Sequence, residues 1–160
     1  MRDSTLVILL KGNPVSKVLL GYKKIGFGQG KYTGFGGKIE HGEGVAEAAL
    51  RELTEETGIR VPDPESLEFG AILEFRFPRK RAWEQRVFVF LAQYWAGGPA
   101  ESNEMVPQWF AIEDIPYDQM WDDARHWLPL ILSGEKFKVC FKFRADNQTV
   151  SIVKFSPIHI

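Results

Sequence analysis

Residues 37–59, with the sequence GKIEHGEGVAEAALRELTEETGI, contain the most informative pattern of the 160-residue chain. Apolar residues recur there at spacings of three and four, which is the period of one face of an α-helix. This face consists of Val45, Ala48, Ala49 and Leu53. Gly58 follows, a residue suited to the left-handed conformation that ends many helices. The pattern therefore predicts a helix over residues 45–57, preceded by a loop.

Three glutamates lie on another face of this predicted helix. Glu52, Glu55 and Glu56 are related by spacings of three and four, so their side chains project together. They also occupy the last turns of the helix, where the helix dipole disfavours acidic side chains. A solvated acidic face is one interpretation. A site for Mg²⁺ is the other, because the cation binds carboxylate oxygens together with substrate phosphates and would remove the repulsion.

The charged residues are unevenly distributed along the chain. Residues 1–38 contain seven bases and one acid, whereas residues 39–70 contain nine acids and two bases. Six glycines between Gly26 and Gly37 indicate tight turns or the close approach of a ligand to the backbone. Two solvated faces would explain the charges, and so would a site in which bases hold phosphates and carboxylates hold a cation. The asymmetry alone does not choose between them.

The rest of the chain alternates between short strand patterns and turns, with one more helical pattern. The predicted strands cover residues 5–10, 16–22, 68–77, 85–95, 108–111, 136–144 and 149–155. A second helix is predicted over residues 122–133, ended by Gly134, and residues 96–107 are predicted to form a loop. A mixed sheet with two helices packed on it is an α+β fold arranged as an α/β/α sandwich. We expect residues 1–160 to form a single domain.

The composition argues against several classes of protein. The net charge is −1, which disfavours broad electrostatic binding to a nucleic acid polymer. The longest apolar runs, Leu6–Leu10 and Val87–Ala92, are far shorter than the roughly 20 residues of a membrane-spanning helix. Cys140 is the only cysteine, which suits a reducing compartment, and the N-terminus has no secretory signal pattern. We therefore expect a cytoplasmic monomer without membrane or nucleic acid partners.

The spacing of the glycines, glutamates and arginine resembles the complete Nudix box. The matching positions are Gly37, Glu43, Arg51, Glu52, Leu53, Glu55, Glu56, Gly58 and Ile59. The resemblance implies the Nudix α/β/α sandwich and hydrolysis of a nucleoside diphosphate linked to another group, with Mg²⁺ as cofactor and Mn²⁺ as a second candidate. It also implies that Glu52, Glu55 and Glu56 hold the metal. By the same resemblance, Arg51 orients glutamates through ion pairs, and the Gly36 carbonyl faces the cation.

The resemblance extends over nearly the whole chain to the animal oxidised purine nucleoside triphosphatases. The shared stretches include Gly21–Lys24, Gly26–Gly28, Gly34–Lys38, Glu101-Ser102, Glu104-Met105, Trp109-Phe110, Met120-Trp121 and Phe141–Phe143. Those enzymes cleave 8-oxo-dGTP and 2-oxo-dATP to the monophosphate and diphosphate, which removes damaged nucleotides from the pool. The resemblance implies that Glu104 also serves the metal site and that Lys23 contacts the substrate.

The resemblance further implies a set of substrate-binding residues, with two departures. The set is Lys23, Phe27, Thr33, Phe35, Gly36, Gly37, Lys38, Trp121, Asp122 and Asp123. Thr33 stands where the related enzymes have an asparagine that bonds the base. Asp122, Asp123 and Ala124 stand where they have Pro-Asp-Asp, whose two aspartates recognise the purine edge. We expect Asp123 to keep the main base contact, Asp122 to cap the second helix, and the preference for an oxidised base to be weaker.

Aromatic residues outside these motifs have two interpretations. Phe75 and Phe77 alternate along a predicted strand, so both face the same side of it and form either core or the floor of a pocket. Trp83 and Trp127 are expected to pack in the interior.

Metal-assisted attack of water on phosphorus is the reaction that this set of residues implies. Glu56 or Glu52 is the expected proton acceptor, with Glu104 as the alternative. Lys23 and Lys38 would hold phosphates as point charges. Three alternatives are a Nudix hydrolase of another substrate (a dinucleotide, nucleotide sugar, pterin triphosphate or capped RNA), an inactive nucleotide-binding sensor, and an isomerase on the same scaffold. The complete set of box glutamates disfavours the sensor.

Overall fold

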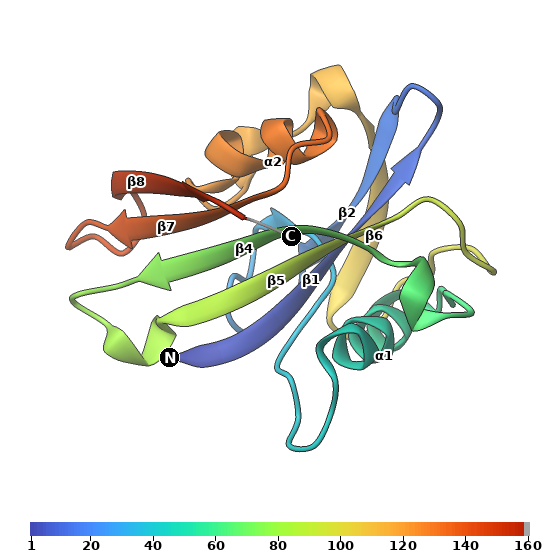
Figure 1. The fold of residues 1–160 in the computed structure, drawn as a ribbon, viewed down its shortest axis with the longest axis horizontal. Helices are drawn as coiled ribbons and strands as arrows, with labels where there is room; N and C mark the ends of the chain where they lie inside the picture. Colours follow the sequence, from blue (N-terminus) through green and yellow to red (C-terminus); the bar gives the residue numbers. More distant parts are fainter. Residues whose placement is uncertain (159–160) are drawn as a thin grey trace.

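A mixed β-sheet forms the centre of the molecule, and one α-helix covers each of its faces (Figure 1). The computed structural model describes residues 1–158. Its strands are β1 (Arg2–Lys11), β2 (Lys17–Lys23), β3 (Tyr32–Thr33), β4 (Glu68–Arg76), β5 (Gln85–Ala92), β6 (Met105–Ala111), β7 (Phe137–Phe143) and β8 (Val150–Pro157). Its α-helices are α1 (Val45–Thr57) and α2 (Ala124–Leu132). Short 3₁₀ turns cover Pro64–Ser66, Arg81–Trp83, Ile112–Asp114 and Tyr117–Gln119.

The strands follow the order β3-β2-β1-β5-β4-β7-β8, and β6 also pairs with β2. The pairs β1–β5 and β4–β7 are parallel, and the other pairs are antiparallel. The predicted α+β sandwich is therefore correct. Within residues 1–158, no helix combines the length and the apolar character that a membrane crossing requires.

Alternation along β1 divides the interior into two cores. Val7 and Leu9 face α1, where they pack with Leu53, whereas Ile8 and Leu10 face α2, where they pack with Trp127. Successive side chains of a strand point to opposite faces, so one strand supplies both cores. The sheet consequently separates the α1 side of the molecule from the α2 side, as Figure 1 shows.

Helix α1 has the predicted bounds and ends at Gly58, whose φ of 78° is the left-handed conformation that favours glycine. Helix α2 begins at Ala124 rather than at the predicted Asp122, and its N-terminal cap position is Asp123. Strand β6 begins at Met105, whereas the prediction placed a loop up to Pro107. A proline is tolerated there because, among residues 1–158, β6 pairs only with β2 and leaves its other edge free of a strand partner.

The glycine-rich segment 34–38 completes the sheet beside β1. Strand β2 pairs with β1 only over Leu9–Lys11, and segment 34–38 takes the place next to the other half of β1. The Val7 N–H donates to the Phe35 carbonyl (2.6 Å), and the Thr5 N–H donates to the Gly37 carbonyl (2.9 Å). This segment therefore has one side toward the α2 face of the sheet and the other toward α1.

Candidate active site

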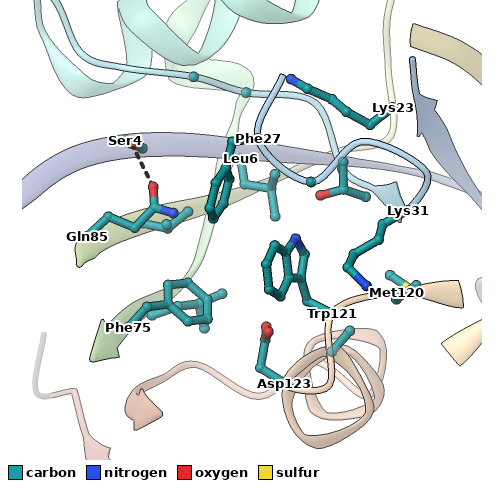
Figure 2. A pocket seen from close by; sticks show the side chains of 18 of the residues that line it. Ser4, Leu6, Lys23, Phe27, Lys31, Phe75, Gln85, Met120, Trp121 and Asp123 are labelled. Carbon is teal, nitrogen blue, oxygen red and sulfur yellow. Dashed lines mark hydrogen bonds between the residues drawn. The ribbon is translucent and has the colours of Figure 1, made fainter. Parts of the chain in front are cut away.

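A cavity of about 360 Å³ lies on the α2 side of the sheet (Figure 2). Its floor comes from β1, β4 and β5, and the loop between β2 and β3 and the start of α2 enclose it. Most residues of the predicted substrate set line it: Lys23, Phe27, Thr33, Gly36, Gly37, Lys38, Trp121 and Asp123. Phe75 and Phe77 line it as well, which agrees with the pocket interpretation of this strand.

Stacked aromatic rings form one wall of the cavity. Phe27 and Trp121 lie nearly parallel, with ring centroids 5.2 Å apart and an interplanar angle of 18°. Trp83 packs edge-on against both rings, 5.0 Å from Phe27 and 6.2 Å from Trp121. Lys31 places its Nζ 5.0 Å from the centroid of the Trp121 ring. Flat apolar walls of this kind suit a flat aromatic ligand such as a nucleobase.

Asp123 is the buried acid of the cavity. Asp123 is only 4% exposed, and its Oδ2 accepts a hydrogen bond from Trp127 Nε1 at 2.7 Å. The pKa of this carboxyl is raised to about 6, mainly by burial and slightly by the nearby charge of Asp122, although the Trp127 hydrogen bond opposes the shift. Asp123 can therefore either donate or accept a hydrogen bond close to neutral pH.

Asp122 does not have the roles expected from the sequence. It lies outside the cavity, and its Oδ2 accepts a hydrogen bond from the Val150 backbone N–H at 2.9 Å. Its Oδ1 pairs with Arg125 Nε at 3.2 Å. The helix begins two residues later than predicted, and Asp122 is turned toward β8 rather than into the cavity. The predicted helix cap is wrong, and Asp122 is not among the residues that line the cavity.

Phe35 is also misassigned by the sequence prediction. Its side chain is fully buried in the core on the α1 side, together with Leu53 and Ile59. Segment 34–38 runs along β1 in an extended conformation, and alternation turns Phe35 away from the cavity. Phe35 is therefore a core residue rather than a substrate contact.

The glycine pair of segment 34–38 connects the cavity with the carboxylates of α1. The backbone N–H of Gly36 donates to Glu56 Oε1 at 2.8 Å. A Cβ on Gly37 would lie 2.6 Å from the Glu52 carboxylate, and one on Gly36 would lie 1.7 Å from the Thr5 carbonyl oxygen. Only glycines allow the segment to pass this closely between β1 and the acidic face of α1.

Glu56 is a buried carboxyl with one free oxygen. The residue is 2% exposed, and its Oε2 has no hydrogen-bond partner among residues 1–158. Burial raises its pKa to about 8, and the Glu52 charge adds to the shift, whereas Lys23 and the Gly36 hydrogen bond oppose it. An unpaired buried carboxyl oxygen is costly unless it receives a proton, a water or a cation.

Arg51 holds the other acidic side chains around it. Its Nε lies 2.7 Å from Glu43, and its Nη1 lies 3.0 Å from Glu52 and 3.5 Å from Glu55. Its Nη2 donates to the Lys38 carbonyl at 3.1 Å. The hydrogen bond from Arg51 lowers the pKa of Glu43 to about 2. The arginine thus ties the loop before α1 to the acidic face of the helix.

The residues present fit a divalent cation in their chemistry. Glu56 Oε2 is an unpartnered buried oxygen, and Glu55, Glu56 and Glu104 line one shallow depression next to it. Glu104 also lies 3.9 Å from Lys23 Nζ. The carboxylates are not converged, however: no group of three acidic, histidine or cysteine side chains within residues 1–158 is placed to hold an ion. Glu52 and Glu55 pair with Arg51 instead.

Several residues that line the cavity were missed in the sequence analysis. They include Arg2, Ser4, Leu6, Lys31 and Gln85. Ser4 and Leu6 could have been found, because they alternate with the core residue Ile8 on the same face of β1. No local pattern marks Gln85, which reaches the cavity only because β5 pairs with β1, with Gln85 opposite Arg2.

The fold and the site together define a class of protein, an α/β/α sandwich in which a glycine pair joins an aromatic cavity to a carboxylate-bearing helix. The family described as the NUDIX domain matches residues 1–131. The chain therefore belongs to the Nudix family, as the sequence pattern predicted.

Individual relatives agree with this assignment. The chain is 43% identical to an oxidized purine nucleoside triphosphate hydrolase of Danio rerio, over 94% of both chains. It is 41% identical to the protein of that name from Mus musculus, over 91% of this chain and 88% of the relative. The crystal structure of a MutT protein from Bacillus halodurans has the same fold, with a TM-score of 0.80 at 24% identity over 99% of this chain and 100% of the other.

Proposed function

We propose that this protein hydrolyses oxidised purine nucleoside triphosphates, such as 8-oxo-dGTP or 2-oxo-dATP, to the monophosphate and diphosphate. The observation that carries the proposal is the hydrogen bond from Gly36 to the buried Glu56, next to a base-sized cavity that contains Asp123. The names of the fish and mouse relatives support the substrate class. The activity would remove oxidised nucleotides from the nucleotide pool.

A divalent cation, Mg²⁺ or Mn²⁺, is part of the proposal. Glu52, Glu55, Glu56, Glu104 and the Gly36 carbonyl would hold it. When bound, such an ion neutralises phosphate charge and lowers the pKa of a coordinated water. Arg51 contacts Glu52 Oε1 and Glu55 Oε2, which leaves the second oxygen of each carboxylate for the cation.

Glu56 is the proposed proton acceptor. Its carboxyl is buried, and its free Oε2 is available to an incoming proton. Glu52 is the second candidate and Glu104 the alternative. Arg51 positions these glutamates, and Lys23 and Lys38, which both line the cavity, hold phosphate oxygens.

The base occupies the aromatic part of the cavity in this proposal. Phe27 and Trp121 supply the apolar surface, and Asp123 supplies the buried hydrogen-bonding group. Thr33 and Ala124 also line the cavity but offer less polar recognition than the asparagine and aspartate found in the related enzymes. Discrimination between oxidised and normal purines is therefore expected to be weaker.

The test is diphosphate release across a substrate panel. The panel contains 8-oxo-dGTP, 2-oxo-dATP, dGTP and dATP, together with a dinucleotide, a nucleotide sugar, a pterin triphosphate and a capped RNA. We expect Mg²⁺-dependent release from the oxidised purines at the highest kcat/KM, and loss of release in chelator. Preference for another member of the panel would assign a different Nudix substrate, and binding without turnover would identify a sensor.

We further propose that residues 1–160 work as one domain, as a monomer, in the cytoplasm. The glycine pair, the carboxylates and the cavity all come from one chain, so a second copy is not needed to complete the site. Light scattering should give the monomer mass of 18.2 kDa.

A further inference from the structure

Gln85 brings a side-chain amide into the cavity at the end opposite Lys31 (Figure 2). Its Oε1 accepts a hydrogen bond from Ser4 Oγ at 3.1 Å, and Ser4 is itself buried, with 6% of its surface exposed. The bond fixes the plane of the amide. Nε2 faces the cavity in Figure 2 and donates no hydrogen bond to any residue within 1–158.

The amide retains the groups needed to form two further hydrogen bonds. A glutamine side chain has two N–H donors and an oxygen with two lone pairs, of which Ser4 uses one. The free lone pair and an N–H on neighbouring atoms form a donor and acceptor pair with fixed geometry. Such a pair matches a ligand edge that carries a C=O beside an N–H.

Oxidation of a purine creates this edge. In 8-oxoguanine the C8–H becomes C8=O, and the neighbouring N7 changes from an acceptor to an N–H donor. In the keto form of 2-oxoadenine, C2=O stands beside N1–H in the same way. Unmodified guanine has an acceptor N7 beside C8–H, and unmodified adenine has an acceptor N1 beside C2–H. At these places each base could accept one hydrogen bond from Nε2 but would set a ring lone pair against Oε1. Guanine also carries C6=O beside N1–H, so the proposal requires Gln85 to face the N7 and C8 edge of a guanine base.

The cavity places this amide beside the other polar group of the base site. Gln85 and Asp123 enter the cavity from two sides, with Phe75 below Gln85 and Trp121 above Asp123 (Figure 2). The Gln85 amide and the Asp123 carboxyl, placed on different sides, can contact two edges of one flat purine ring. We propose that Gln85 is a specificity-determining residue that recognises the N–H and C=O edge of an oxidised purine, and that Ser4 is its positioning residue. This inference rests on the proposed function.

The test compares oxidised and normal substrates in Gln85 variants. Gln85→Leu removes both hydrogen bonds, and Gln85→Glu keeps the shape but loses the donor to C=O. We expect the ratio of kcat/KM for 8-oxo-dGTP over dGTP to fall about tenfold or more in both variants, because a bidentate contact discriminates by roughly that factor. Ser4→Ala should give a smaller fall. The matched control is Gln93→Glu, an exposed position after β5, which should leave the ratio unchanged.

A modified substrate gives an independent readout. In 7-methyl-8-oxo-dGTP the N7–H is replaced by a methyl group while C8=O is retained. We compare the fall in kcat/KM from 8-oxo-dGTP to this analogue in the two enzymes. The fall should be larger in the wild-type enzyme than in Gln85→Leu, which has already lost the contact. If Gln85 had a merely structural role, Gln85→Leu would lower kcat/KM for all substrates alike. Wild type and Gln85→Leu would then lose activity on the methylated analogue by the same factor.

The outcomes separate the two levels of the proposal. Diphosphate release from oxidised purines with an unchanged oxidised-to-normal ratio in Gln85→Leu and Gln85→Glu would overturn the Gln85 assignment alone. A wild-type protein that releases no diphosphate from any purine triphosphate would overturn the proposed function and the assignment with it. Thermal unfolding of each variant establishes that the compared proteins are folded.

Discussion

Glu56 combines features that are uncommon in one residue. Its carboxyl is buried, one oxygen is bonded to the Gly36 N–H, the other has no partner among residues 1–158, and its pKa is raised to about 8. A purely structural glutamate at this place would be a costly choice, because the unpaired oxygen stabilises nothing. The arrangement becomes favourable when the oxygen receives a proton or binds a cation, which is why the catalytic proposal is centred on this residue.

Glu56→Gln should therefore cut turnover by about a hundredfold or more while the protein stays folded, since the amide keeps the shape but cannot take the proton or bind a cation as well. The measurement is kcat for diphosphate release, with circular dichroism as the folding check. Glu113→Gln, at an exposed position, is the control. A Glu56→Gln enzyme with normal turnover would contradict the assignment.

Asp123 predicts a pH dependence of stability. Its folded-state pKa of about 6 lies above the ordinary value of 3.8, so folding favours the protonated form. The contribution to stability is therefore fully present below about pH 4 and is lost as the pH rises through about 6. The difference in unfolding free energy between wild type and Asp123→Asn should fall by roughly 3 kcal/mol over that interval. Urea unfolding at a series of pH values measures it, and a constant difference would refute the raised pKa.

Asp122 and Asp123 should differ in their effect on substrate choice, although they are adjacent. Asp123 lines the cavity, whereas Asp122 bonds the Val150 N–H and pairs with Arg125. Asp123→Asn should change the ratio of oxidised to normal purine hydrolysis, by about 1–3 kcal/mol for a single contact. Asp122→Asn should leave that ratio nearly unchanged and act on stability instead. The reverse ranking would show that Asp122 recognises the base.

At the scale of the elements, the sequence predicts most accurately where local chemistry decides the structure. The bounds of α1 follow from its apolar period and Gly58, and the strand patterns locate the sheet. The start of α2 was wrong because Asp122 is engaged by β8, a partner far away in the chain. Phe35 was misassigned because the face of the sheet toward which its side chain points depends on the pairing of segment 34–38 with β1. Gln85 could not be found at all, since it reaches the cavity through non-local strand register.

Arg51 couples two elements, the loop before α1 and the helix itself. It bonds Glu43 and the Lys38 carbonyl of the loop and pairs with Glu52 of the helix. Arg51→Gln should release the loop, speed amide hydrogen exchange in residues 38–43 and lower kcat about tenfold to a hundredfold through misplaced carboxylates. Arg51→Lys keeps the charge but not the planar fork, so it should recover only part of the loss. Arg60→Gln, a change at an exposed position, is the control. An amide exchange rate in residues 38–43 that is the same in Arg51→Gln as in the wild type would contradict the coupling.

At the scale of the whole molecule, the sheet keeps the proposed base site and the proposed hydrolytic site apart. The aromatic cavity lies on the α2 side, the glutamates belong to the helix on the α1 side, and segment 34–38 connects the two regions. A nucleotide whose base lies beside Trp121 must extend its phosphate chain past Gly36 and Gly37 before a phosphorus meets the glutamates. We propose that the phosphorus attacked there is the β-phosphorus.

Attack at the β-phosphorus predicts the fate of the water oxygen. In ¹⁸O-labelled water, the label should enter the diphosphate, because the β-phosphorus gains the solvent oxygen and the nucleoside monophosphate departs with its bridging oxygen. Mass spectrometry of both products measures the distribution. Label in the monophosphate would place the attack at the α-phosphorus instead. Release of orthophosphate would mean attack at the γ-phosphorus and would exclude diphosphohydrolase chemistry, whichever base the cavity holds.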